Sequence, residues 1–132
     1  MHLGEPAGAI AQAETTLRLN PRDPSIFGSY ALLGWAHVLS NHVDQSIEWL
    51  IKARGENPRI WYVHNALAGA LGLKGDIESA KASLADLEKT KPEINSIANS
   101  YVYAPFLAYP PYRALIDKTI NEGLRRAGFP ET

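Results

Sequence analysis

The sequence predicts an all-α protein built from packed pairs of helices. Apolar residues recur at three- and four-residue steps, and the nine prolines fall between these periodic segments. No segment shows the two-residue alternation of a half-buried strand. The 132 residues fit one domain, which at this length can bury a core without disulfides.

The proline spacing indicates a repeat. Pro24, Pro58 and Pro92 stand 34 residues apart, twice in succession. Each interval contains two apolar stripes at helical spacing. The first interval has Phe27, Tyr30, Leu33, Gly34 and His37, then Val43, Ile47, Leu50 and Ile51; the second has Ile60, Val63, Leu67 and Leu71, then Ile77, Ala80, Leu84 and Leu87. A fixed period of this size is typical of helix–turn–helix arrays.

Residues between the stripes have the chemistry of helix ends. Gly75 can adopt positive φ after the first helix of the second interval, and Asp76 can cap the next helix through its carboxylate. Asn41 occupies the corresponding place one period earlier and also tolerates the left-handed region. Gly69 and Gly72 lie inside a predicted helix, where close helix packing explains them better than a phosphate loop.

Together these residues resemble the tetratricopeptide repeat, a 34-residue helix–turn–helix unit. The resemblance implies a right-handed αα-superhelix of such units with a C-terminal capping helix, in which the first helix of each unit lines a concave surface. The matching residues are Tyr30, Leu33, Gly34, His37, Ser46, Leu50, Ala53 and Pro58 in the first unit, and His64, Leu67, Ala68, Leu71, Ala80, Leu84, Leu87 and Pro92 in the second.

The chain divides accordingly into four parts. Residues 1–22 resemble the second helix of a truncated repeat, so we expect a fragment of a longer protein. Residues 23–58 and 59–92 are the two full units. Residues 93–132 should hold a short helix over 93–103, a proline-interrupted bend, and a final capping helix from Pro111 to a stop at Gly128. Its apolar side would comprise Tyr112, Leu115, Ile116, Ile120 and Leu124.

Two segments, residues 17–24 with Phe27 and residues 122–131, carry a narrower resemblance. They are similar to the C-terminal repeat region of bacterial regulators in which the repeats follow a class III adenylate/guanylate cyclase domain or a winged-helix DNA-binding domain. The resemblance brings no catalytic residue to this chain. Both segments also have a structural interpretation, which we favour: Asp23 and Pro24 begin a helix, and Phe129 folds back after a helix stop.

Composition narrows the functional classes. The chain has no cysteine, so thiolate metal sites and thiol nucleophiles are excluded. A formal net charge of -1 with no basic run argues against nucleic acid, and no apolar stretch is long enough for a membrane span. We expect a cytoplasmic protein without cofactor or metal. His37 and His64 fall at packing positions and His42 in a turn, so we interpret these histidines as structural or solvent-facing.

The remaining candidate is the concave surface, where aromatic rings and amides would bind a protein or peptide within or between chains. Its predicted contact residues are Trp35, Val38, Tyr62, Asn65, Asn99 and Tyr103. An equally weighted alternative is that the C-terminal segment folds over this surface. The sequence thus predicts a non-enzymatic interaction module, the regulatory or scaffolding part of a bacterial signalling protein. The alternatives are an accessory domain of an adenylate cyclase and a structural or homodimerising element.

Overall fold

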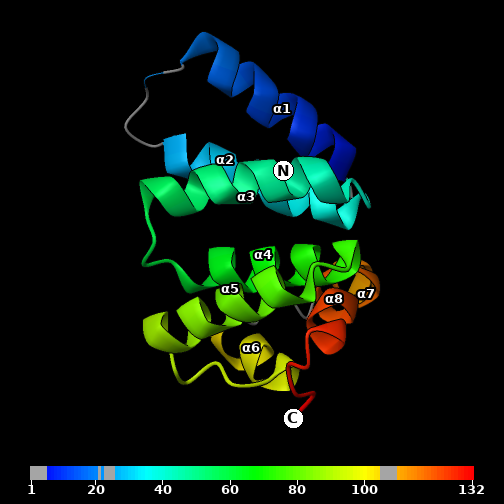
Figure 1. The fold of residues 1–132 in the computed structure, drawn as a ribbon. Helices are drawn as coiled ribbons and strands as arrows, with labels where there is room; N and C mark the ends of the chain where they lie inside the picture. The colour runs from blue at the N-terminus through cyan, green and yellow to red at the C-terminus, as the bar shows by residue number, and fades with distance from the viewer. Residues whose placement is uncertain (1–5, 21, 23–25, 105–109) are drawn as a thin grey trace.

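The computed structural model describes residues 6–20, 22, 26–104 and 110–132, and in these residues it is all-helical with no strand, as the sequence predicts (Figure 1). The helices are α1 (Pro6–Leu19), α2 (Ile26–Leu39), α3 (Val43–Glu56), α4 (Trp61–Lys74), α5 (Ile77–Thr90), α6 (Ile97–Tyr103), α7 (Pro110–Lys118) and α8 (Ile120–Arg126). Among these helices, none combines the length and the apolar character that crossing a bilayer requires.

The centre of the molecule is two consecutive helical hairpins, α2 with α3 and α4 with α5. The hairpins stack because α3 packs on α4, and α1 packs on the outer side of α2. Figure 1 shows this order from α1 at one end to α6 at the other, with α7 and α8 against one side of the second hairpin. The buried core runs through both hairpins and continues into α8.

The backbone repeats with the period of the prolines. Asn41 has φ 63° and Gly75, 34 residues later, has φ 90°. Both residues end their helices in the same way, since the next amide donates five residues back: His42 N to the His37 carbonyl and Asp76 N to the Leu71 carbonyl. The Asp76 carboxylate then accepts from Ser79 N at 3.2 Å. The predicted helix ends at Asn41 and Gly75 and the predicted cap at Asp76 are confirmed.

Small residues bring the helices of the first hairpin together. A Cβ on Gly34 would collide with the Leu50 side chain, which is fully buried. Beside it, the Ser46 hydroxyl donates to the Gly34 carbonyl at 2.6 Å, so the buried hydroxyl is satisfied. The small residues of the repeat pattern therefore set the close approach of α2 and α3.

The C-terminal part differs from its prediction in two places. α6 begins at Ile97 and not at residue 93, because the Ser96 hydroxyl caps it by accepting from Asn99 N at 3.0 Å. The single helix predicted from Pro111 is two helices, broken at Thr119, whose φ is -117° and ψ -86°. On its predicted apolar side, Ile116, Ile120 and Leu124 are buried and Leu115 is half-buried.

The predicted stop after α8 is confirmed. Gly128 has φ 90°, and Phe129 N donates back to the Leu124 carbonyl at 2.9 Å. The following residues reach α6, where Ile97 N donates to the Pro130 carbonyl at 2.8 Å. Other predictions fall outside the described residues: the helix start at Asp23 and Pro24, the part of the proline-interrupted bend in residues 105–109, and the side chain of Tyr112.

Candidate functional site

One side of α4 is closed by α8 through contacts between backbones. A Cβ on Gly69 would lie 2.7 Å from the Ile120 carbonyl oxygen, and a Cβ on Gly72 or Gly123 would collide with the opposite main chain. Only glycine allows two helices to approach so closely. The close packing predicted for Gly69 and Gly72 is confirmed, and its partner is α8.

This closed side includes part of the predicted concave surface. Asn65 lies on the same stripe of α4, one turn before Gly69, and its side chain is only 3% exposed. Trp35 and Val38 on α2 are 8% and 0% exposed. A partner approaching the folded chain would not reach these three side chains.

The other three predicted contact residues remain accessible. Tyr62 is half-buried and packs edge-to-face on Trp61, with ring centroids 6.0 Å apart. Asn99 on α6 is half-buried as well. Tyr103, at the end of α6, is 43% exposed and has the Lys91 ammonium 4.8 Å from its ring centroid. The structure therefore leaves two aromatic rings of the predicted set accessible, and the amide of Asn99 only in part, because its Oδ1 is buried.

Three of the six predicted residues also carry a buried polar atom without a hydrogen-bond partner in the described part of the chain. These atoms are Trp35 Nε1, Asn65 Oδ1 and Asn99 Oδ1. Most buried polar atoms in proteins are paired, because an unpaired one costs free energy. The first helices of the two hairpins and α6 thus retain unused hydrogen-bonding capacity.

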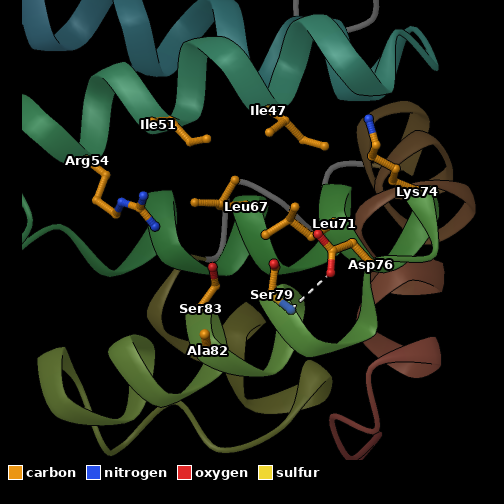
Figure 2. Close-up of a pocket in the computed structure, with 10 residues that line it drawn as sticks. All are labelled: Ile47, Ile51, Arg54, Leu67, Leu71, Lys74, Asp76, Ser79, Ala82 and Ser83. Carbon is orange, nitrogen blue, oxygen red and sulfur yellow. Dashed lines mark hydrogen bonds between the residues drawn. The ribbon is translucent and has the colours of Figure 1, made fainter.

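The opposite side of α4 is open. A cavity of about 400 Å³ lies there between α3 and α5, with α4 as its floor (Figure 2). We call it the outer groove. It is lined by Ile47, Ile51 and Arg54 from α3, by Leu67, Leu71 and Lys74 from α4, and by Asp76, Ser79, Ala82 and Ser83 from α5 and its cap. A volume of this size is in the range of binding pockets.

The residue pattern of the outer groove explains why it is open. The residues from α3 and from α4 each follow one another at four- and three-residue steps, so each set forms one stripe. The α5 wall is small because Ala and Ser occupy it. Ile51 belongs to the predicted apolar stripe of this helix, and it is 45% exposed at the edge of the cavity. The apolar periodicity of α3 identifies the stripe; the small wall across from it is the signal that the sequence reasoning missed.

Charge is unevenly distributed along the outer groove. At one end Lys74 Nζ lies 2.6 Å from Asp44 Oδ1, and this hydrogen bond raises the pKa of the lysine. Asp76 stands at the same end. At the other end the Arg54 guanidinium points into the space between the helices (Figure 2) and has no carboxylate within 4.0 Å among the described residues. One end is internally neutralised, whereas the other presents a cation.

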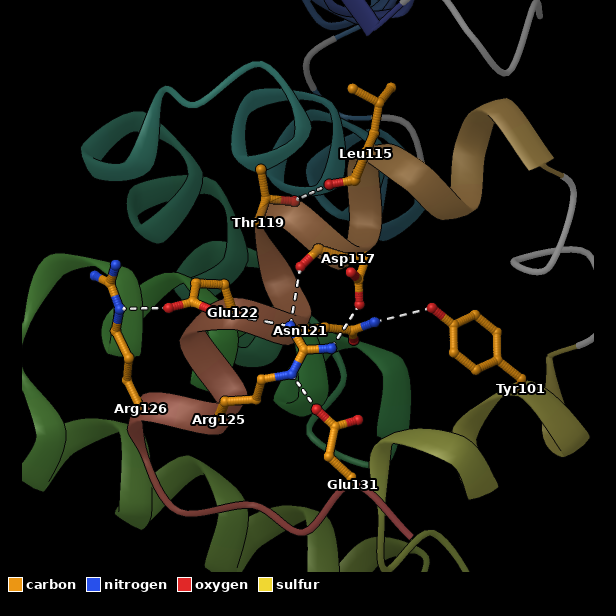
Figure 3. Close-up of polar contacts among 9 residues, drawn as sticks. All are labelled: Tyr101, Leu115, Asp117, Thr119, Asn121, Glu122, Arg125, Arg126 and Glu131. Atoms are coloured by element: carbon orange, nitrogen blue, oxygen red, sulfur yellow. Dashed lines mark hydrogen bonds and ion pairs between the residues drawn. The ribbon is translucent and has the colours of Figure 1, made fainter.

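A polar cluster fastens the C-terminal helices (Figure 3). Arg125 on α8 donates to Asp117 on α7 at 2.6 Å and to Glu131 beyond α8. The hydrogen bond from Arg125 lowers the pKa of Asp117. Asn121 Nδ2 donates to the Tyr101 hydroxyl of α6 at 2.9 Å. Segment 122–131 thus joins α7 through Arg125 and α6 through the Pro130 carbonyl, in agreement with the structural interpretation of that segment.

Two of the histidines form a pair. His37 Nδ1 lies 3.1 Å from His42 Nδ1, and burial, followed by the charge of His42, lowers the pKa of His37. His64 is 2% exposed, and its Nε2 lies 2.7 Å from the Pro58 carbonyl. No cluster of three or more metal-ligating His, Cys, Asp or Glu side chains occurs in the described ranges.

The geometry stands without a relative to interpret it. No family model, no curated protein and no solved structure matches the chain. The resemblances to tetratricopeptide repeats and to cyclase-associated regulators therefore stay predictions.

Proposed function

We propose that this chain is a non-enzymatic helical-repeat module that binds a protein partner, as the regulatory or scaffolding part of a bacterial signalling protein. The signalling context rests only on the resemblance of residues 17–24 and 122–131. The binding role rests on the fold and on its surfaces. Stacked helical hairpins present long stripes of side chains, which suit recognition of another chain.

The observation that carries the proposal is the outer groove. Its floor, Leu67 and Leu71, is buried, while Ile51 at its rim is 45% exposed. Removing such apolar surface from water is the main driving force of protein association. Apolar surface flanked by charged residues is also the usual anatomy of a protein interface.

The proposal shifts the contact surface from the predicted concave side to the outer groove. α8 already packs against the glycine stripe of α4, and Trp35, Val38 and Asn65 are buried. Of the predicted residues, Tyr62 at the start of α4 and Asn99 and Tyr103 on α6 are the ones that are not buried.

Selection from a displayed library of helical peptides tests the proposal. Purified chain serves as bait, and each selected peptide is measured against Ala82→Trp, in which the indole would fill the outer groove. Ala82 is exposed, so the substitution should leave the fold intact. We expect at least tenfold weaker binding to this variant, measured by fluorescence polarisation.

Val102→Trp is the matched control, because Val102 is 69% exposed on α6 and does not line the groove. Circular dichroism confirms that both variants fold. Peptides that bind all three proteins equally, or a selection that yields no binder, would reject the outer groove as the contact surface. Peptides weakened by Tyr62→Ala instead would return the contact to the predicted concave side.

A further inference from the structure

We infer that the outer groove binds one amphipathic helix of a partner protein, and that this helix presents an acidic side chain to Arg54. The inference rests on the proposed function and adds the conformation and the charge of the ligand. It follows from the shape of the groove, the state of the backbone around it, and its uneven charge.

The shape fits the stripe of a helix. From Ile47 to Arg54 the α3 wall spans seven residues, about 10 Å at the rise of an α-helix. A partner helix places apolar residues at the same four- and three-residue steps over this length. Ser79, Ala82 and Ser83 make the facing wall shallow, so a helix axis could approach α5 closely.

The backbone around the groove favours a helix over an extended peptide. An extended peptide gains affinity by pairing its amides and carbonyls with a free strand edge. The three elements around this groove are helices, and their main-chain groups are paired internally except at the ends. A helical ligand satisfies its own main chain, so it can lie against Ile51 and Ala82, the exposed apolar residues of the groove lining, without leaving polar groups unpaired.

The uneven charge of the outer groove determines the direction in which the ligand helix binds. Lys74 is paired with Asp44, so that end of the groove does not demand a charged partner. Arg54 is half-buried and forms no ion pair within 4.0 Å in the described ranges, even with Asp86, one turn beyond Ser83 on α5. A guanidinium pairs best with a carboxylate, which it binds through two parallel hydrogen bonds. An Asp or Glu at the Arg54 end of the ligand helix would therefore both bind and fix its direction.

The experiment uses the peptides selected for groove binding, each synthesised with its acidic residue and with the matching amide. We expect Arg54→Gln to weaken the acidic peptide about fivefold and to leave the amide peptide unchanged. The Arg54→Glu variant should in turn bind a peptide with lysine in place of the acidic residue more tightly than the acidic peptide. Lys81→Gln is the matched control, since Lys81 is an exposed cation on α5 that does not line the groove.

The outcomes separate this inference from the proposed function. One contrary result is that the selected peptides bind Ala82→Trp more weakly than wild type and yet show no preference for an acidic residue. Another is that they bind Arg54→Gln as tightly as wild type. Either result would overturn the acidic-helix ligand but would leave the proposed function intact. Peptides without helical circular dichroism in the complex would overturn it as well. Sedimentation supplies the last arm: if wild-type chain dimerises and Ala82→Trp abolishes the dimer, the occupant is a second copy. A selection without any groove-dependent binder overturns both proposals.

Discussion

The two sides of α4 have different surroundings: α8 covers one side, and the outer groove lies along the other. On the α8 side, Gly69 and Gly72 face Gly123, and the main chains are in contact. On the other side, Leu67 and Leu71 form the floor of a cavity of about 400 Å³. The glycine side gains stability from close packing, whereas on the leucine side apolar surface is left for a partner at the rim, where Ile51 is 45% exposed.

The difference lies in what stands across from α4. Because glycines line the contact, α8 lies so close to α4 that no side chain fits between the two helices. Ile120 and Leu124 of α8 are therefore buried in the core. Opposite the leucines, the α5 wall is built from Ser79, Ala82 and Ser83, which are too short to fill the space towards α3. A surface for recognition arises here from small residues on a neighbouring helix.

The largest expected effect is on the closed side. In Gly72→Leu the new side chain would meet the Gly123 backbone, so α8 must move away and Ile120 and Leu124 lose their burial. We expect the free energy of unfolding to fall by about 4 kcal/mol, about 2 kcal/mol for each side chain. Urea denaturation measures this value, and limited proteolysis should cut the chain near α8 first.

Gly28→Ala is the control for glycine replacement. Gly28 is an exposed residue of α2 with nothing within 4 Å of its Cβ position, so alanine should stabilise the helix by about 0.5 to 1 kcal/mol. Equal effects of Gly72→Leu and Gly28→Ala would contradict the closed side as described.

The next effect separates stability from binding on the open side. Leu67 is 1% exposed and shared by the core and the outer groove, so Leu67→Ala should cost about 3 kcal/mol of unfolding free energy and also weaken groove peptides. Ile51 is 45% exposed, and Ile51→Ala should weaken the same peptides while changing stability by less than about 0.5 kcal/mol. Denaturation together with fluorescence polarisation measures both quantities. A binding loss in Leu67→Ala alone would mean that the rim takes no part in recognition.

The helical class and the helix ends were predictable because they depend on local chemistry. Asn41 and Gly75 adopt positive φ for reasons internal to a few residues, and Asp76 needs only its own helix to act as a cap. The exact start of α6 was less predictable, since Ser96 and not the earlier Glu93 begins the helix. The break at Thr119 has no glycine or proline to signal it.

The candidate site was harder to predict because it depends on packing between distant segments. The concave prediction for Asn65 used the repeat pattern, which does not state that α8 will pack on Gly69 and Gly72. The outer groove depends on the contrast between a large α3 stripe and a small α5 wall. The sequence shows the difference in side-chain size, but a cavity results only because α3 and α5 lie side by side over α4.

A smaller effect is the pH dependence of stability, which we expect from the histidine pair at the end of α2. Burial, with the charge of His42, lowers the pKa of His37 below its ordinary 6.5, while Glu14 opposes this shift. The unfolded chain therefore binds the proton more readily, and stability should fall as pH drops below about 6.5. Two protonated rings would also lose the contact between their Nδ1 atoms, since both would be donors.

Urea denaturation at pH 7.5, 6.5 and 5.5 measures this dependence. His42→Asn should reduce the slope, because it removes the positive neighbour but leaves His37 buried. A slope that His42→Asn leaves unchanged would assign the pH dependence to burial alone. An increase in stability towards pH 5.5 would contradict the lowered pKa of His37.

The smallest effect should come from the polar cluster that fastens α8 over the closed side. Arg125→Gln removes the ion pairs with Asp117 and Glu131, but the arginine side chain is 33% exposed and both acids are 56% exposed. Solvent screens such pairs, so we expect the free energy of unfolding to fall by less than about 1 kcal/mol. The loss should shrink further in 1 M salt, where charges act over only about 3 Å.

The same ion pair should make stability depend on pH. Because Arg125 lowers the pKa of Asp117, the wild-type chain should lose stability as pH falls below about 4, and the variant should lose less. Lys118→Gln is the control, since Lys118 is an exposed cation of α7 that takes part in none of these ion pairs. A loss as large as that of Gly72→Leu would show that the charges, and not the glycine contact, hold α8 against α4.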